Sequence, residues 1–172
     1  IESGATLNVQ DCNVTFQFPS VPCLITVNGQ LMAVNASFQD GDMRIESPCG
    51  EVEFAGCVIS LPTGVGGGVV EGGRLNLSDT TFIGGQGWNV NGSEVAVVDC
   101  EIHDQSGAWL FSSSILNISG LIVLGGTGTD LVSSHGMIDD SSWTGTEMGL
   151  SIDRCGPLSL YDLVLEGNGR DV

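Results

Sequence analysis

The sequence predicts an all-β fold in which short strands wind into a coil of stacked rungs, a β-solenoid. Three observations support this prediction. A phrase of alternating apolar residues recurs eight times, every copy is interrupted at its fifth position by a turn residue, and a further apolar run precedes each later copy. Self-similarity at intervals of 20 to 24 residues is typical of a repeat architecture in which each unit packs against its neighbours.

The phrase reads apolar, any, apolar, any, turn residue, small or apolar, any, apolar. Its copies begin at Leu7, Leu31, Val52, Leu75, Val95, Leu116, Ile138 and Leu158. Apolar residues at every second position predict strands, because successive side chains of a strand point to opposite faces. The fifth position is one extra residue that interrupts this alternation, so it predicts a tight corner between two strands. The residues at this position are Asp11, Asn35, Gly56, Asp79, Asp99, Gly120, Ser142 and Asp162. Asp, Asn and Gly are the residues that tolerate the backbone of such a corner.

A third strand in each rung is predicted from the apolar run before the next phrase, as at residues 88–90 and 109–111. Variable stretches rich in Gly and polar residues precede this strand, as at residues 62–68 and 125–130. We therefore expect about eight rungs of 20–24 residues, each with three short parallel strands. The rungs form one domain over residues 1–172, which we expect to be a segment of a longer chain.

This pattern resembles the right-handed parallel β-helix of the pectate-lyase-like superfamily. The resemblance covers essentially the whole chain and rests on the phrase, its fixed corner and the variable loop. It implies a right-handed coil, and a protein that either processes polysaccharide or extends from cells. A leucine-rich repeat is the competing fold, because residues 52–59 fit the core of its motif. That motif also requires a leucine three residues earlier, where this chain has Gly4, Asn28, Cys49, Gly72, Gly92, Ser113, His135 and Cys155.

The charge balance is strongly acidic, with 21 acidic residues against four arginines, no lysine and a net charge of −17. This balance argues against nucleic acid and anionic membranes as partners, because both are negatively charged. No apolar stretch approaches the roughly 18 residues of a membrane span. Calcium and cationic partners are compatible with the charge, although acidic residues spread along a repeat usually form a solvated face.

Five Asn-x-Ser/Thr acceptors for N-glycosylation favour a secreted or cell-surface protein. They are Asn13, Asn35, Asn76, Asn91 and Asn117. We therefore expect an extracellular or cell-surface location.

Six cysteines in such a chain predict either disulfides or buried free thiols. Cys12, Cys57 and Cys100 share one column and would lie about 9.6 Å apart at two rung spacings, too far for a bridge. The pairs Cys12–Cys23 and Cys49–Cys57 could close within one turn.

The three tryptophans, Trp88, Trp109 and Trp143, are predicted to stack in the core. The alternative is exposure on one face of the coil, where aromatic rings can stack on sugars.

The seventh copy of the phrase is irregular. In the register that starts at Ile138, Asp140 stands where an inward apolar residue belongs, and such a break marks function or strain. His135 with Asp139 and Asp140 is similar to the Gly-His-Gly and Asp-Asp motifs of β-helix polygalacturonases, which use paired carboxylates. No Asn-x-Asp precedes these residues and no Arg-x-Lys follows them. A shift of one residue, which brings Met137 into the apolar position, would turn Asp140 outward and remove the anomaly.

Two further groups could bind a metal ion. Asp40, Asp42 and Glu46 offer closely spaced oxygen ligands of the kind that calcium prefers, or form a solvated turn. His103, beside Glu101 and Asp104, could join a metal or acid–base site or lie on the surface.

These observations lead to one main functional hypothesis and two alternatives. The main hypothesis is a non-enzymatic segment of a large secreted or cell-surface protein, acting as a rigid stalk, an adhesive or a carbohydrate- or partner-binding surface. Its expected partners are other domains of the same polypeptide and a carbohydrate or cell-surface partner. No cofactor is expected, with calcium as the alternative. The alternatives are a carbohydrate-active enzyme, either a polysaccharide hydrolase or a lyase, and a subunit of an end-to-end extracellular filament.

Overall fold

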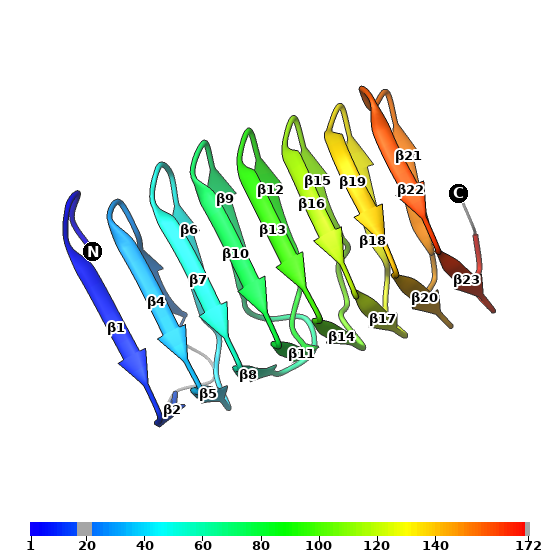
Figure 1. Ribbon diagram of the computed structural model, residues 1–172. Helices are drawn as coiled ribbons and strands as arrows, with labels where there is room; N and C mark the ends of the chain where they lie inside the picture. The colour runs from blue at the N-terminus through cyan, green and yellow to red at the C-terminus, as the bar shows by residue number, and fades with distance from the viewer. Residues whose placement is uncertain (17–21, 171–172) are drawn as a thin grey trace.

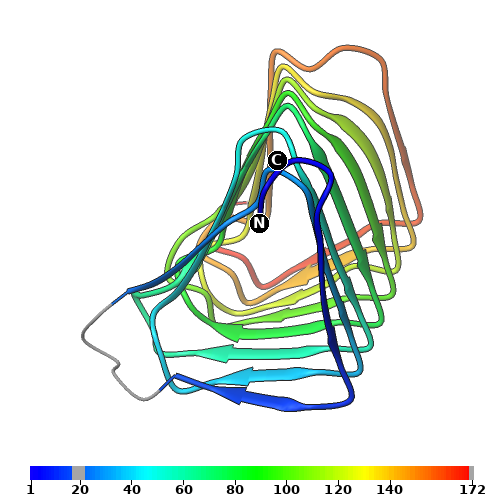
Figure 2. The same ribbon diagram turned by 90° about the vertical axis from the view of Figure 1, so that its left-hand side faces the viewer.

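The structure, a computed structural model, describes residues 1–16 and 22–170. Within these ranges it contains 23 β-strands and no helix. The strands wind into a coil whose rungs follow one another from the N-terminus to the C-terminus (Figure 1). A view turned by 90° shows the successive rungs nested in similar outlines (Figure 2). The predicted β-solenoid is confirmed, and the leucine-rich repeat is excluded because the segment that returns to each new phrase is a strand.

Each rung contributes strands to three parallel sheets, which we call A, B and C. Sheet A consists of β1 (Thr6–Gln10), β4 (Gln30–Val34), β7 (Glu51–Ala55), β10 (Arg74–Ser78), β13 (Glu94–Val98), β16 (Ile115–Ser119), β19 (His135–Asp139) and β22 (Leu158–Tyr161). Sheet B consists of β2 (Asn13–Thr15), β5 (Ser37–Gln39), β8 (Val58–Leu61), β11 (Thr81–Gly84), β14 (Glu101–His103), β17 (Ile122–Leu124), β20 (Ser142–Thr144) and β23 (Val164–Glu166). Sheet C consists of β3 (Cys23–Thr26), β6 (Met43–Ser47), β9 (Gly67–Glu71), β12 (Trp88–Asn91), β15 (Trp109–Ser112), β18 (Thr129–Val132) and β21 (Leu150–Asp153).

We number the rungs 1 to 8 by their strand in sheet A. In the described part of the chain, rungs 1 to 7 carry all three strands and rung 8 carries two. Equivalent positions of the phrase pair directly, so that Leu75 lies between Val52 and Val95. Columns of the repeat are therefore vertical neighbours, about 4.8 Å apart. The hand of the coil stays a prediction.

The corner between sheets A and B has a left-handed backbone in every rung. Its residues have φ between 46° and 66°, and they are Asp11, Asn35, Gly56, Asp79, Asp99, Gly120, Asp140 and Asp162. This geometry explains the choice of residues, because only Gly, Asn and Asp adopt it at low cost.

The seventh corner corrects the predicted register. Asp140, not Ser142, occupies the corner, and the phrase starts at Gly136, which pairs with Leu116 and Leu158. Starting the copy at Ile138 was wrong. The alternative shift to Met137 was one residue too short, although its consequence, an outward Asp140, is confirmed because Asp140 is exposed. A Cβ on Gly136 would lie 2.0 Å from the carbonyl oxygen of Leu116, which explains a glycine where the phrase has an apolar residue. The apparent inward carboxylate at Asp140 therefore does not exist.

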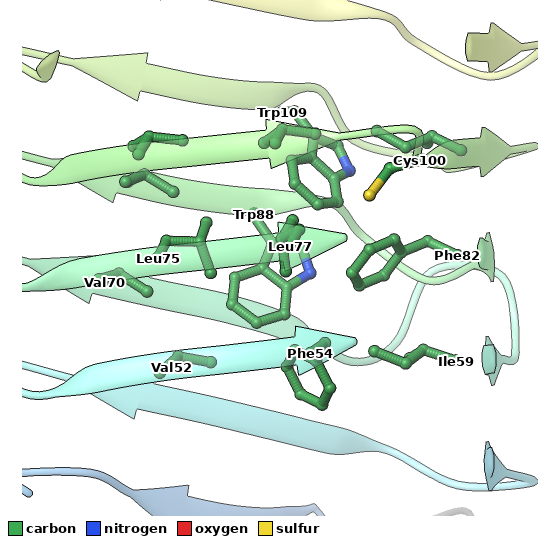
Figure 3. Packing of buried hydrophobic residues seen from close by; sticks show 14 of the residues in the cluster. Val52, Phe54, Ile59, Val70, Leu75, Leu77, Phe82, Trp88, Cys100 and Trp109 are labelled. Atoms are coloured by element: carbon green, nitrogen blue, oxygen red, sulfur yellow. The ribbon is translucent and has the colours of Figure 1, made fainter. Parts of the chain in front are cut away.

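The core is a continuous column of apolar side chains, with aromatic rings in its middle rungs (Figure 3). Trp88 and Trp109 stack with ring centroids 5.8 Å apart and an interplanar angle of 29°. Gly68 makes room for the Trp88 ring, because a Cβ there would lie 2.2 Å from it. Trp88, Trp109 and Trp143 are at most 3% exposed. The predicted core role is confirmed, and the buried rings are not available to stack on sugars.

The corner between sheets C and A is lined inside by hydroxyl groups in its C-terminal half. Ser93, Ser114 and Ser134 open rungs 5, 6 and 7, and all are at most 2% exposed. Each hydroxyl donates a hydrogen bond to a sheet C carbonyl 23 or 24 residues earlier in the chain, over 3.0 to 3.4 Å. The Ser114 hydroxyl also accepts from the Ser93 amide, and the Ser134 hydroxyl from the Ser114 amide. Cys155 continues this series in rung 8, with its thiol 3.5 Å from the Leu131 carbonyl.

All six cysteines are free thiols. The bridges Cys12–Cys23 and Cys49–Cys57 are not formed. The alternative of buried free thiols holds for Cys57 and Cys100 only, because the other four thiols are exposed or half-buried. Cys57 and Cys100 are buried and donate to backbone carbonyls in the corner between sheets A and B. Burial raises the pKa of the Cys57 thiol, and it raises the pKa of Cys100 to about 11. These thiols take the place that the hydroxyls of Thr80 and Ser141 occupy in other rungs.

Candidate functional site

A groove of about 800 Å³ follows the corner between sheets C and A, where the loops at the top of Figure 1 lie. Its lining combines small residues of the corner with the side chains that start each sheet A strand. The small residues are mostly glycines, at positions 4, 29, 50, 72, 73 and 92. The strand-start side chains are Thr6, Gln30, Glu51, Arg74, Glu94, Ile115 and His135. At one residue per rung, this column extends about 29 Å along the coil axis.

Five of the strand-start side chains form a continuous polar ladder. Thr6 donates to Gln30 over 3.3 Å, and Gln30 donates to Glu51 over 3.1 Å. Arg74 lies 3.7 Å from Glu51 and donates to Glu94 over 3.0 and 3.1 Å. The hydrogen bond to Glu94, with the charges of both carboxylates, raises the pKa of the Arg74 guanidinium. The ladder therefore places one positive charge between two negative charges.

The glycines of the groove are required by close contacts between rungs. A Cβ on Gly73 would lie 2.1 Å from the Gly50 carbonyl oxygen, and a Cβ on Gly50 would lie 2.5 Å from that of Val27. A Cβ on Gly29 would lie 2.2 Å from the Ala5 carbonyl oxygen. Larger residues cannot fill this half of the corner, so the groove is bordered by backbone.

The structure does not bring His135, Asp139 and Asp140 together. His135 and Asp139 are the first and last residues of β19, about 13 Å apart at roughly 3.3 Å per residue. His135 lines the groove, whereas Asp140 lies at the corner between sheets A and B. One oxygen of Asp139 is buried and has no hydrogen-bond partner in the described part of the chain. The acid and base roles of a polygalacturonase need two carboxyl groups that face one glycosidic bond. Asp139 and Asp140 lie at the opposite end of β19 from His135, so the three residues do not form such a site.

Asp40, Asp42 and Glu46 also do not converge on one point. The Asp42 carboxylate accepts two hydrogen bonds of 3.0 Å from Arg44 and one of 2.8 Å from the Gly66 amide. Asp42 is 5% exposed, so its carboxylate anchors the loop that contains Gly66. The hydrogen bond to Asp42 raises the pKa of the Arg44 guanidinium.

Metal ligands do not cluster within residues 1–16 and 22–170, where no group of three or more His, Cys, Asp or Glu has the required arrangement. His103 and Glu101 are two positions apart in β14, with the His103 Nε2 atom 3.0 Å from a carboxylate oxygen of Glu101. The calcium hypothesis stays a prediction without a defined site.

The five glycosylation acceptors occupy different environments. Asn13, Asn91 and Asn117 are exposed strand residues, one on each sheet. Asn35 is at a corner and donates to Asp11 over 3.2 Å. Asn76 is half-buried and donates to Glu51 over 3.1 Å.

No protein-family model, curated protein or solved structure matches this chain. The resemblance to the pectate-lyase-like superfamily therefore stays a prediction beyond the shared coil architecture. In the described part of the chain, no helix is long and apolar enough to cross a membrane.

The groove is the feature that sequence reasoning missed. Glu51, Arg74 and Glu94 each stand immediately before the first apolar residue of a phrase. That shared position was a usable signal, because stacking makes equal positions of consecutive copies vertical neighbours.

Proposed function

We propose that this chain is a non-enzymatic segment of a secreted or cell-surface protein, in which the coil is a rigid stalk and the groove a binding surface for carbohydrate or a protein partner. The observation that carries the proposal is the unbroken register of the three sheets. Every strand pair is parallel and aligns equivalent positions of the repeat, as between β10 and its two neighbours. Such a stack extends about 34 Å over eight rungs.

The core supports a stiff coil. Buried apolar side chains continue from Val27 in rung 1 to Leu150 in rung 7, and a core packed at crystal-like density has low compressibility. A stalk needs this property along its whole length, whereas a catalytic site needs it only around one cleft.

The groove supports a binding role because its polar groups repeat along the axis. Ligands that bind concave surfaces use a few convergent polar groups for orientation. Glu51, Arg74 and Glu94 supply such groups in three consecutive rungs. A linear polymer lying along the axis would meet them in sequence.

Binding is tested on immobilised neutral and acidic polysaccharides, with and without calcium. We expect the wild-type chain to be retained by at least one of them, and Arg74→Gln to be retained less. Arg154→Gln is the matched control, because Arg154 is also exposed and paired, with Asp153, but does not line the groove. Retention that is equal in Arg74→Gln would remove the groove as the binding surface.

The same incubations test the enzyme alternative. The stalk hypothesis predicts no release of reducing or unsaturated ends. Release that disappears in Asp140→Asn would show that the chain is a carbohydrate-active enzyme.

Location is tested on intact cells that express the natural full-length protein. An antibody against the coil should label them without permeabilisation. Labelling only after permeabilisation would contradict a secreted or cell-surface protein.

A further inference from the structure

Two of the five glycosylation acceptors differ from the others in the folded chain. The side chains of Asn13 in β2 and Asn117 in β16 are exposed, and neither makes a side-chain hydrogen bond within the described part of the chain. The hydroxyl residue of each acceptor motif, Thr15 or Ser119, is two positions further along the same strand. Residues two apart point to the same face of a strand, so the amide and the hydroxyl lie on one face; Thr15 is exposed and Ser119 is half-buried.

Each of the other three acceptors lacks one of these properties. The amide nitrogens of Asn35 and Asn76 already donate to Asp11 and Glu51. Asn91 is exposed, but the hydroxyl of its motif belongs to Ser93, which is 2% exposed. That hydroxyl donates to the Val70 carbonyl inside the corner.

We propose that Asn13 and Asn117 are the N-glycan acceptors of the folded protein, an inference that rests on the secreted or cell-surface setting proposed above. In the transfer, the side-chain nitrogen Nδ2 forms a bond to the anomeric carbon of a diphosphate-activated sugar. The bond between that carbon and the phosphate oxygen breaks, and the diphosphate leaves with the bonding electrons. Nδ2 loses one proton to a base of the transferase, which the cell supplies together with the donor.

The two positions determine which faces the glycans cover. Asn13 belongs to sheet B in rung 1 and Asn117 to sheet A in rung 6, about 24 Å apart along the axis. Asn117 borders a shallow depression that Arg74, Glu94 and Ile115 also line. A glycan on Asn117 therefore stands beside the polar ladder of the groove, whereas sheet C stays uncovered.

The test uses chain produced in a host without N-glycosylation. The folded chain, and the same chain digested to peptides, are incubated with a soluble N-glycosyltransferase and a nucleotide-diphosphate hexose. Peptide masses then give the occupancy of each asparagine over time. In the digest, we expect all five acceptors to gain hexose.

In the folded chain, we expect only Asn13 and Asn117 to gain hexose rapidly. Asn91 should react at least about tenfold more slowly, because rung 5 must open before Ser93 is reached. Asn13→Gln and Asn117→Gln should each remove one hexose, and the matched control Asn91→Gln should remove none. The proposal is overturned if Asn91 in the folded chain reacts as fast as Asn117, or if Asn13 and Asn117 stay unmodified while the digest reacts. Neither result depends on cell-surface labelling, so failure of this inference is distinct from failure of the proposed function.

Discussion

The corner between sheets C and A is built in two ways along the same molecule. At the start of rungs 2, 3 and 4 the inward position is Gly29, Gly50 or Gly73, and the backbones of adjacent rungs approach too closely for a Cβ. At the start of rungs 5, 6 and 7 the same position is a serine, whose hydroxyl donates to a sheet C carbonyl about one repeat earlier in the chain.

The two halves of this corner therefore differ in role: serine hydroxyls pair buried backbone groups in one half, and most of the groove lies along the other. The serine half satisfies buried polar groups, which cost about 1 to 3 kcal/mol each when left unpaired. The glycine half leaves the Ser47 hydroxyl buried without a partner in the described part of the chain, and most of the groove lies along it.

The largest expected effect comes from adding a methyl group to the glycine half. Gly73→Ala places a Cβ 2.1 Å from the Gly50 carbonyl oxygen, and we expect this to lower the free energy of unfolding by about 3 kcal/mol. Gly156→Ala is the control, because its Cβ would meet nothing closer than 3.4 Å. Denaturant unfolding followed by tryptophan fluorescence measures both. Equal stability of the two variants would show that the close approach is not a constraint.

A somewhat smaller effect is expected in the serine half. Ser114→Ala leaves the Ser93 amide and the Val90 carbonyl without the hydroxyl they share, at a cost of about 2 kcal/mol. Ser114→Cys should cost less, because Cys155 shows that a thiol can donate in this column. If the cysteine variant unfolds as easily as the alanine variant, thiols and hydroxyls are not equivalent in these corners.

Alkaline pH probes the buried thiols. Burial raises the pKa of Cys100 from 9.0 to about 11, so the folded state holds a proton that the unfolded state releases. The stabilisation is fully present below pH 9 and is lost as the pH rises toward 11, by about 1 kcal/mol between pH 9 and pH 10. Stability measured across this range should fall less steeply in Cys100→Ser. An equal slope in both proteins would contradict the assignment to Cys100.

The smallest effect on stability is expected from the polar ladder. Arg74 is an exposed ion-pair residue, and exposed pairs contribute little to folding. Arg74→Gln should therefore unfold like the wild-type chain while its retention on polysaccharide falls. A large loss of stability would show that the ladder supports the coil instead of offering a binding surface.

The fold could be predicted from the sequence because each of its requirements admits few residue types. Strands need apolar residues at every second position, and the left-handed corner needs Asp, Asn or Gly. The seventh copy was misplaced because Gly136 satisfies a contact with Leu116 that no count of apolar residues reveals. The predicted core position of all three tryptophans is confirmed, although Trp143 occupies the last position of its phrase and not the sixth.

The candidate site was harder to predict. Its side chains occupy the same position of the repeat, but they differ in residue type, so no sequence motif links them. Thr6, Gln30, Glu51, Arg74 and Glu94 become a ladder only when the rungs stack. The hydroxyls inside the corners were also missed, since serine, cysteine, threonine, alanine and leucine alternate in equivalent columns. In contrast, His135, Asp139 and Asp140 are close in sequence, and an extended strand separates the first of them from the other two.

The central claim is that equal positions of consecutive repeats are neighbours across parallel strands. Backbone nuclear Overhauser effects in the isotope-labelled chain test it directly. We predict contacts from Leu75 to both Val52 and Val95, and from the corner at Asp140 to Tyr161. Contacts between antiparallel strands, or helical contacts between residues three and four apart, would contradict the stacked coil and every inference built on it.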